Sequence, residues 1–102
     1  MTSLVEDRRD AIVTACQRHG VTQLHIFGSA LREDFRPGVS DIDLLVQFEV
    51  LPPHELADAY FSLLDELRSI LGSPVDLVMA DAVKNRFILA EIDRTKRILY
   101  AA

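Results

Sequence analysis

Three aspartates have the types and spacing that most directly predict chemistry in this sequence. Asp41 and Asp43 lie two residues apart at the start of an apolar run, so in a strand both side chains would leave the same face. Two like charges at the mouth of a buried strand repel each other unless a cation lies between them. The alternative is that Asp41 caps a turn and Asp43 faces water, and the pair alone leaves both interpretations open.

Asp76 supplies a third carboxylate, near the start of a second β-type run. If the segment between the two runs is a crossover between parallel strands, both strands begin at the same end of the sheet. Neighbouring strands are about 4.8 Å apart, and three converging carboxylates could hold two Mg²⁺ or Mn²⁺ ions about 3.5–4 Å apart. Oxygen ligands favour these ions over zinc. The alternative for Asp76 is an acid that caps the turn after Pro74.

Gly28 and Ser29 end an earlier strand-like segment. If that segment pairs antiparallel with the Asp41 strand, its end lies near the carboxylates. A glycine lets the backbone approach a phosphate closely, and a serine hydroxyl with neighbouring N–H groups can hold the phosphate oxygens. An ordinary strand-ending turn is the alternative. Arg32 could neutralise a triphosphate, or it could pair with Glu33 or Asp34.

Hydrophobic periodicity predicts the elements that position these residues. We expect helices over residues 4–19, 54–71 and 81–93, and strands over residues 22–27, 42–48, 75–79 and 97–101. Ser3 and Glu6 have capping-box spacing, Asp81 is the expected cap of the last helix, and a helical turn is expected near residues 32–35. This order predicts an α/β or α+β fold, with a small mixed sheet of about four strands flanked by helices.

The apolar stripe of the long helix over residues 54–71 is wide. Phe61, Leu63 and Ile70 extend it beyond one core face. A second buried surface against a partner and a wide core stripe are both open interpretations.

Length and composition restrict the function classes. The 102 residues are 49% hydrophobic and 26% charged, which predicts a single folded domain over residues 1–102. A formal charge of −5 argues against direct nucleic-acid binding. Cys16 cannot form an internal disulfide, and its apolar surroundings make it a poor nucleophile. No apolar run reaches membrane-spanning length and the first residues are charged, so we expect a cytoplasmic protein without a membrane segment.

Two segments together carry a family resemblance. Phe27-Gly28-Ser29-Ala30-Leu31-Arg32, followed by Ser40-Asp41-Ile42-Asp43-Leu44-Leu45-Val46, resembles the signature of the polymerase-β-type nucleotidyltransferase superfamily, and most closely its minimal nucleotidyltransferase (MNT) branch. The resemblance spans nearly the whole chain and includes Pro74-Val75-Asp76-Leu77-Val78. Eleven residues separate Ser29 from Asp41, where ten are usual, and we expect the extra residue at Pro37-Gly38-Val39.

The resemblance implies a polymerase-β-type nucleotidyltransferase fold and specific roles for the motif residues. The implied metal-binding and catalytic carboxylates are Asp41, Asp43 and Asp76, and the implied nucleotide contacts are Gly28, Ser29, Arg32 and Ser40. Minimal members are similar to antitoxins encoded beside a HEPN ribonuclease toxin. The implied activity is therefore metal-dependent transfer of AMP from ATP to a tyrosine hydroxyl of that toxin. The resemblance also implies that the protein could form a hetero-oligomer with the toxin.

Two other functions remain open at this point. A non-catalytic antitoxin could neutralise the toxin by binding alone, and larger relatives transfer nucleotides to small molecules or RNA ends. All three acids are present, which favours chemistry over binding alone. His19, His25 and His54 have no spacing that suggests a shared metal, so structural roles are expected for them.

Overall fold

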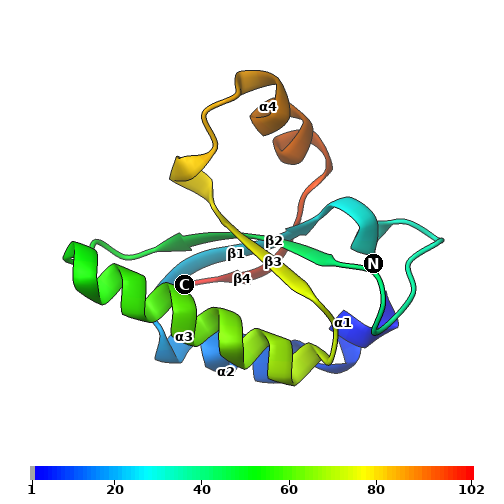
Figure 1. Ribbon diagram of the computed structural model, residues 1–102, viewed down its shortest axis with the longest axis horizontal. Coiled ribbons are helices and arrows are strands. Elements are labelled where there is room, and N and C mark those ends of the chain that lie inside the picture. Colours follow the sequence, from blue (N-terminus) through cyan, green and yellow to red (C-terminus); the bar gives the residue numbers. More distant parts are fainter. Residues whose placement is uncertain (1) are drawn as a thin grey trace.

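The computed structural model describes residues 2–102, apart from the side chain of Ser29. Its centre is a four-stranded sheet in the order β3-β2-β1-β4 (Figure 1), built from β1 (Val21–Phe27), β2 (Ile42–Phe48), β3 (Val75–Met79) and β4 (Arg97–Ala101). β1 pairs antiparallel with β2 and with β4, whereas β2 and β3 are parallel. The prediction of a small mixed sheet in an α+β fold is confirmed.

Helices lie on both faces of this sheet. α1 (Ser3–Asp7), α2 (Arg9–Arg18) and α3 (Pro53–Leu71) cover one face, and α4 (Arg86–Thr95) stands over the other (Figure 1). Alternate strand residues, among them Leu24 and Leu44, point into the core between the sheet and the first three helices. The intervening residues face α4, and we call this side the open face. Across residues 2–102, no helix has both the length and the apolar character needed to cross a membrane.

α3 is the crossover between the parallel strands β2 and β3. Pro53 occupies its first turn, where a missing N–H costs nothing, and Gly72 ends it with a φ of +60° while donating its N–H to Arg68 O at 2.9 Å. Leu63 is buried in the core, whereas Phe61 is 65% exposed. The wide apolar stripe therefore belongs to the core only in part, and Phe61 lies outside the core.

The prediction of one helix over residues 4–19 is wrong. The chain leaves helical geometry at Arg8, with φ of −112° and ψ of 15°, which separates α1 from α2. The capping residue is also one position earlier than expected, because Thr2 Oγ1 accepts a hydrogen bond from Leu4 N at 3.4 Å. Both helices still bury an apolar residue completely, Val5 in α1 and Ile12 in α2.

The last helix begins later than predicted. Asn85, not Asp81, caps α4, and its Oδ1 accepts hydrogen bonds from the backbone N–H groups of Phe87 and Ile88. Asp81 belongs instead to a short 3₁₀ turn, η2 (Ala80–Ala82). The helical turn expected near residues 32–35 also lies earlier, as the 3₁₀ turn η1 (Gly28–Leu31) that directly follows β1.

Candidate active site

The register of the three adjacent strands brings the predicted acidic residues to one end of the sheet. Asp43 of β2 is the direct partner of Phe27 in β1 and of Asp76 in β3. The end of β1 therefore lies in one row with both acids. The expected crossover geometry is confirmed, because α3 connects β2 to a parallel β3 on its far side from β1.

Asp41 lies immediately before β2. The next N–H, of Ile42, donates to Pro74 O at 2.8 Å and ties the starts of β2 and β3 together. Asp43 is half-buried, whereas Asp41 and Asp76 are exposed. Within residues 2–102, no three acidic, histidine or cysteine side chains are already gathered as a metal-binding cluster. The metal-binding role of the three acids stays a prediction, with Asp43 and Asp76 brought together by the backbone.

Gly28 lies directly against one of these carboxylates. It follows β1 with a φ of +71°, a conformation that residues with a Cβ rarely adopt. A Cβ at this position would overlap Asp43 Oδ2 and lie 3.2 Å from Asp43 Cγ. The absence of a side chain thus leaves the backbone at the start of η1 in close contact with the acidic end of β2.

The remaining predicted nucleotide contacts follow Gly28. Ser29 lies in η1, and its side chain is outside the described residues, so its predicted phosphate contact stays a prediction. Arg32 is exposed just after η1, and in the described part of the chain it forms no ion pair with Glu33 or Asp34. Its guanidinium charge is therefore available beside Gly28.

Ser40 belongs to a tight turn before the acids. Its Oγ accepts a hydrogen bond from Arg36 N at 3.0 Å, and its own N–H donates to Arg36 O at 2.9 Å. Gly38 N also donates to Ser73 Oγ at 2.7 Å, which fastens the turn to the loop before β3. This turn contains Pro37-Gly38-Val39, the expected place of the extra residue. The nucleotide contact predicted for Ser40 stays a prediction.

Two cavities lie between the sheet and α4. One, of about 500 Å³, has a mostly apolar lining that includes Gly28, Arg32, Ile88 and Ile92. The other, of about 330 Å³, lies further along the open face, and its lining includes Gln23, His25, Gln47 and Leu89. The sequence alone predicts only a structural role for His25 and does not single out the two glutamines, although the alternation of β1 places Gln23 and His25 on the face opposite the buried Leu24 and Ile26.

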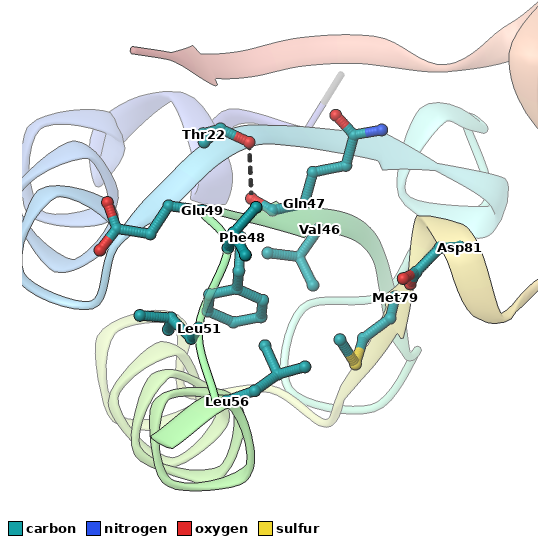
Figure 2. Close-up of a pocket in the computed structure, with 10 residues that line it drawn as sticks. Thr22, Val46, Gln47, Phe48, Glu49, Leu51, Leu56, Met79 and Asp81 are labelled. Atoms are coloured by element: carbon teal, nitrogen blue, oxygen red, sulfur yellow. Dashed lines mark hydrogen bonds between the residues drawn. The ribbon is translucent and has the colours of Figure 1, made fainter. Parts of the chain in front are cut away.

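A third cavity, of about 380 Å³, lies at the other end of β2 from the acids. Figure 2 shows Phe48, Leu56 and Met79 lining it on the α3 side of the sheet. The Gln47 side chain leaves β2 on the opposite side, toward the open face (Figure 2). The cavities of about 330 Å³ and 380 Å³ share Gln47 and Asp81 in their linings, and of these three cavities that of about 500 Å³ is the one that adjoins Gly28.

His19 and Cys16 lie in environments typical of structural residues. His19 Nε2 lies 2.7 Å from Glu66 Oε2, which ties α2 to α3. Cys16 is fully buried, and burial raises the pKa of its thiol to about 12. His25 differs, because it faces the second cavity. Its pKa is lowered first by burial and then by the nearby charge of Lys96, with Asp93 acting in the opposite direction.

Comparison with known proteins agrees with this geometry. Residues 9–100 match the model of a family described as the nucleotidyltransferase domain. The chain belongs to this family. The nucleotidyltransferase motif residues named above, from Gly28 to Asp76, all lie inside the matched range.

Individual relatives of this nucleotidyltransferase carry more specific names. It is 38% identical over 77 residues to a candidate protein adenylyltransferase of Methanocaldococcus jannaschii, covering 76% of this chain and 74% of the relative. It is 33% identical over 90 residues to the protein adenylyltransferase MntA of Thermococcus cleftensis, covering 83% of this chain and 87% of the relative.

Solved structures share its fold. A chain of a toxin–antitoxin crystal structure with AMP-PNP is similar at a TM-score of 0.69 and 22% identity, over 92% of this chain and 73% of that chain. A chain of the complex between the tri-AMPylated HEPN toxin of Shewanella oneidensis and its MNT antitoxin is similar at a TM-score of 0.65 and 21% identity, over 95% and 72% of the two chains. The predicted polymerase-β-type fold of the minimal branch is confirmed.

Proposed function

We propose that this nucleotidyltransferase is a metal-dependent protein adenylyltransferase that acts as an antitoxin. It transfers AMP from ATP to a tyrosine hydroxyl of a HEPN ribonuclease toxin that is encoded nearby. The observation that carries the proposal is the close approach of Gly28 to Asp43, which is in turn paired with Asp76. This arrangement places a backbone segment that a phosphate can approach beside two carboxylates. We further propose that the reaction takes place in the cytoplasm, where ATP is present, and that residues 1–102 act as one minimal domain.

The chemistry of the acidic end fits a divalent cation. The candidate ligands are carboxylate oxygens, which Mg²⁺ and Mn²⁺ prefer, and Asp43 and Asp76 are adjacent on neighbouring strands. Asp41, Asp43 and Asp76 would hold the ion or ions. When bound, such an ion polarises the phosphoryl oxygens and stabilises the charge that develops on them.

The chain's own groups account for the other requirements of the reaction. The N–H groups at the start of η1, with Gly28 and Ser29, bind phosphate oxygens, and Arg32 adds positive charge on the same side. The acceptor hydroxyl attacks the α-phosphorus, a new P–O bond forms, and the bond to the bridging oxygen breaks as pyrophosphate leaves. An aspartate of the acidic end accepts the hydroxyl proton. Ser40 holds the turn that leads into Asp41.

The relatives support the identity of the donor and of the acceptor. Two of them are named as protein adenylyltransferases, one a candidate. The Shewanella structure contains an AMPylated HEPN toxin with its MNT antitoxin. These names favour transfer to a protein over transfer to a small molecule or an RNA end.

The test is incubation with ATP labelled on the α-phosphate, Mg²⁺ and the product of the neighbouring gene. We expect label and an adenylyl-sized mass increase on a tyrosine of that partner. The double variant Asp41→Asn with Asp43→Asn should abolish both. If the partner is neutralised equally well by this variant, neutralisation is by binding alone and the proposed catalysis is wrong.

A further inference from the structure

The cavity of about 330 Å³ on the open face is positioned in line with the acidic end of the sheet. Successive open-face pairs of β1 and β2 are Phe27 with Asp43, His25 with Leu45, and Gln23 with Gln47. All four residues of the second and third pairs line the cavity. A path along the open face therefore runs from the carboxylate of Asp43 to the two glutamine side chains.

The spacing along this path suits a nucleotide. Two residues of strand span about 7 Å and four residues span about 13 Å. The pair of His25 and Leu45 thus lies about 7 Å along the strands from Asp43, and the pair of Gln23 and Gln47 lies about 13 Å from it. If the phosphates lie against η1 and the α-phosphate lies at Asp43, the ribose and base extend in this direction, away from η1.

The lining has the chemistry to recognise a flat heterocycle. Leu45 from the sheet and Leu89 from α4 contribute apolar surface on which a ring can stack. Gln23 and Gln47 each offer one amide donor group and one acceptor, the combination that pairs with the amino group and a ring nitrogen of adenine. His25 lies in the same lining, and its pKa is lowered first by burial and then by the charge of Lys96, with Asp93 acting in the opposite direction; Asp81 lines the cavity as well.

The neighbouring cavity of about 500 Å³ is less suited to this task. Its lining is mostly apolar, and it adjoins Gly28 and Arg32, where the phosphates are expected. Its charged groups are Arg32 and Glu91, and it offers no carboxamide to distinguish one base from another.

We infer that the cavity beneath α4 is the adenine subsite, and that Gln23 and Gln47 determine the preference for adenine. This inference rests on the proposed function, because it takes the α-phosphate to lie at Asp43. Both glutamines are exposed, so their replacement should leave the fold intact.

The test compares Gln23→Met, Gln47→Met and the double variant with Gln17→Met, a matched substitution of an exposed glutamine on α2. Calorimetry in Mg²⁺ measures the binding of ATP, GTP and tripolyphosphate to each protein. We expect the double variant to lose about 10- to 100-fold in ATP affinity. Its affinity for tripolyphosphate should be unchanged, its preference for ATP over GTP should disappear, and Gln17→Met should behave like the unsubstituted protein.

Three outcomes would overturn the inference in distinguishable ways. Equal ATP affinity in all variants, with AMP transfer intact, would mean that the base binds elsewhere and the proposed function stands. Equal losses for ATP and tripolyphosphate would mean that the glutamines act on the phosphates or on the fold. Absence of ATP binding and of AMP transfer in the unsubstituted protein would remove the proposed function together with the subsite.

Discussion

Asp43 and Asp76 are direct partners across the parallel strands β2 and β3. Their side chains leave the same face of the sheet, although 32 positions of sequence, including all of α3, separate them. Parallel pairing requires a long crossover, so the approach of these two acids depends on α3 packing onto the opposite face. Two carboxylates on adjacent strands repel each other when no positive charge lies between them, and the first prediction follows from this.

Asp41→Asn combined with Asp43→Asn should abolish the binding of Mg²⁺ or Mn²⁺ with ATP, because the proposed oxygen ligands lose their charge. Without metal, the melting temperature should be unchanged or raised, since repulsion at the strand start is relieved. Calorimetric titration and thermal melting measure the two effects. Asp65→Asn, at an exposed position of α3, is the control and should change neither. Unchanged metal–nucleotide affinity in the double variant would show that the site is assigned to the wrong residues.

Gly28→Ala should reduce both stability and AMP transfer. The left-handed conformation costs a residue with a Cβ about 1–2 kcal/mol, and the new Cβ would also displace the Asp43 carboxylate. Gly38→Ala is the matched control, because Gly38 has a φ of +82° but its Cβ would meet only Gly72 O, at 3.9 Å. Both variants should have a lower melting temperature than the unsubstituted protein. Only Gly28→Ala should also slow single-turnover transfer by the folded protein. Equal transfer rates in the two variants would argue against a functional contact at Gly28.

Ser29→Ala should lower the transfer rate about 10- to 1000-fold, the range expected for removing one donor to developing charge. The free energy of unfolding should change by about 1 kcal/mol or less. Single-turnover kinetics and melting curves separate these effects, with Ser62→Ala on the exposed surface of α3 as the control. Full activity in Ser29→Ala would remove Ser29 from the site.

The stability of the protein should fall at alkaline pH because of Cys16. Burial raises the thiol pKa from 9.0 to about 12 in the folded chain. Below pH 9 the thiol is protonated in both the folded and unfolded states, so its contribution is fully present. Above that pH the unfolded state loses this proton more readily, and the contribution is lost as pH rises toward 12.

Comparison with Cys16→Ala isolates this effect from other groups that titrate at alkaline pH. Denaturant unfolding measured from pH 8 up to about pH 12 should show a steeper loss of stability in the unsubstituted protein than in the variant. The native thiol should also resist alkylation at pH 8 until denaturant is added, because a buried, protonated thiol is a poor nucleophile. Parallel pH profiles and rapid alkylation of the native protein would both contradict the assigned environment.

The strands and the long helix could be predicted from local patterns. The near-continuous apolar run over residues 42–48 is the pattern of a strand covered on both faces, and β2 lies inside the sheet with those bounds. The apolar periodicity of α3 and its Gly72 stop gave bounds within one residue. These elements are specified by hydrophobic period and by glycine conformation, both of which act over a few residues.

The predictions for the first and last helices failed where caps compete. Ser3 and Asp81 are good capping residues, yet Thr2 and Asn85 are used. Several residues of similar propensity stand near each of these helix starts, and the choice among them depends on how the helix packs. The break at Arg8 likewise has no glycine or proline to mark it, and both resulting helices are directed so that Val5 and Ile12 reach one core.

The sequence by itself determined the kinds of groups at the candidate site: a glycine and a serine after one strand, two acids at the start of the next and a third acid on another strand. Only the tertiary structure decided which of them meet, since the approach of Gly28 to Asp43 and the pairing of Asp43 with Asp76 depend on strand order and register. It also decided that Gln23, His25 and Gln47 line a cavity beneath α4. Such contacts join residues far apart in the chain, and local patterns carry no information about the distance between them.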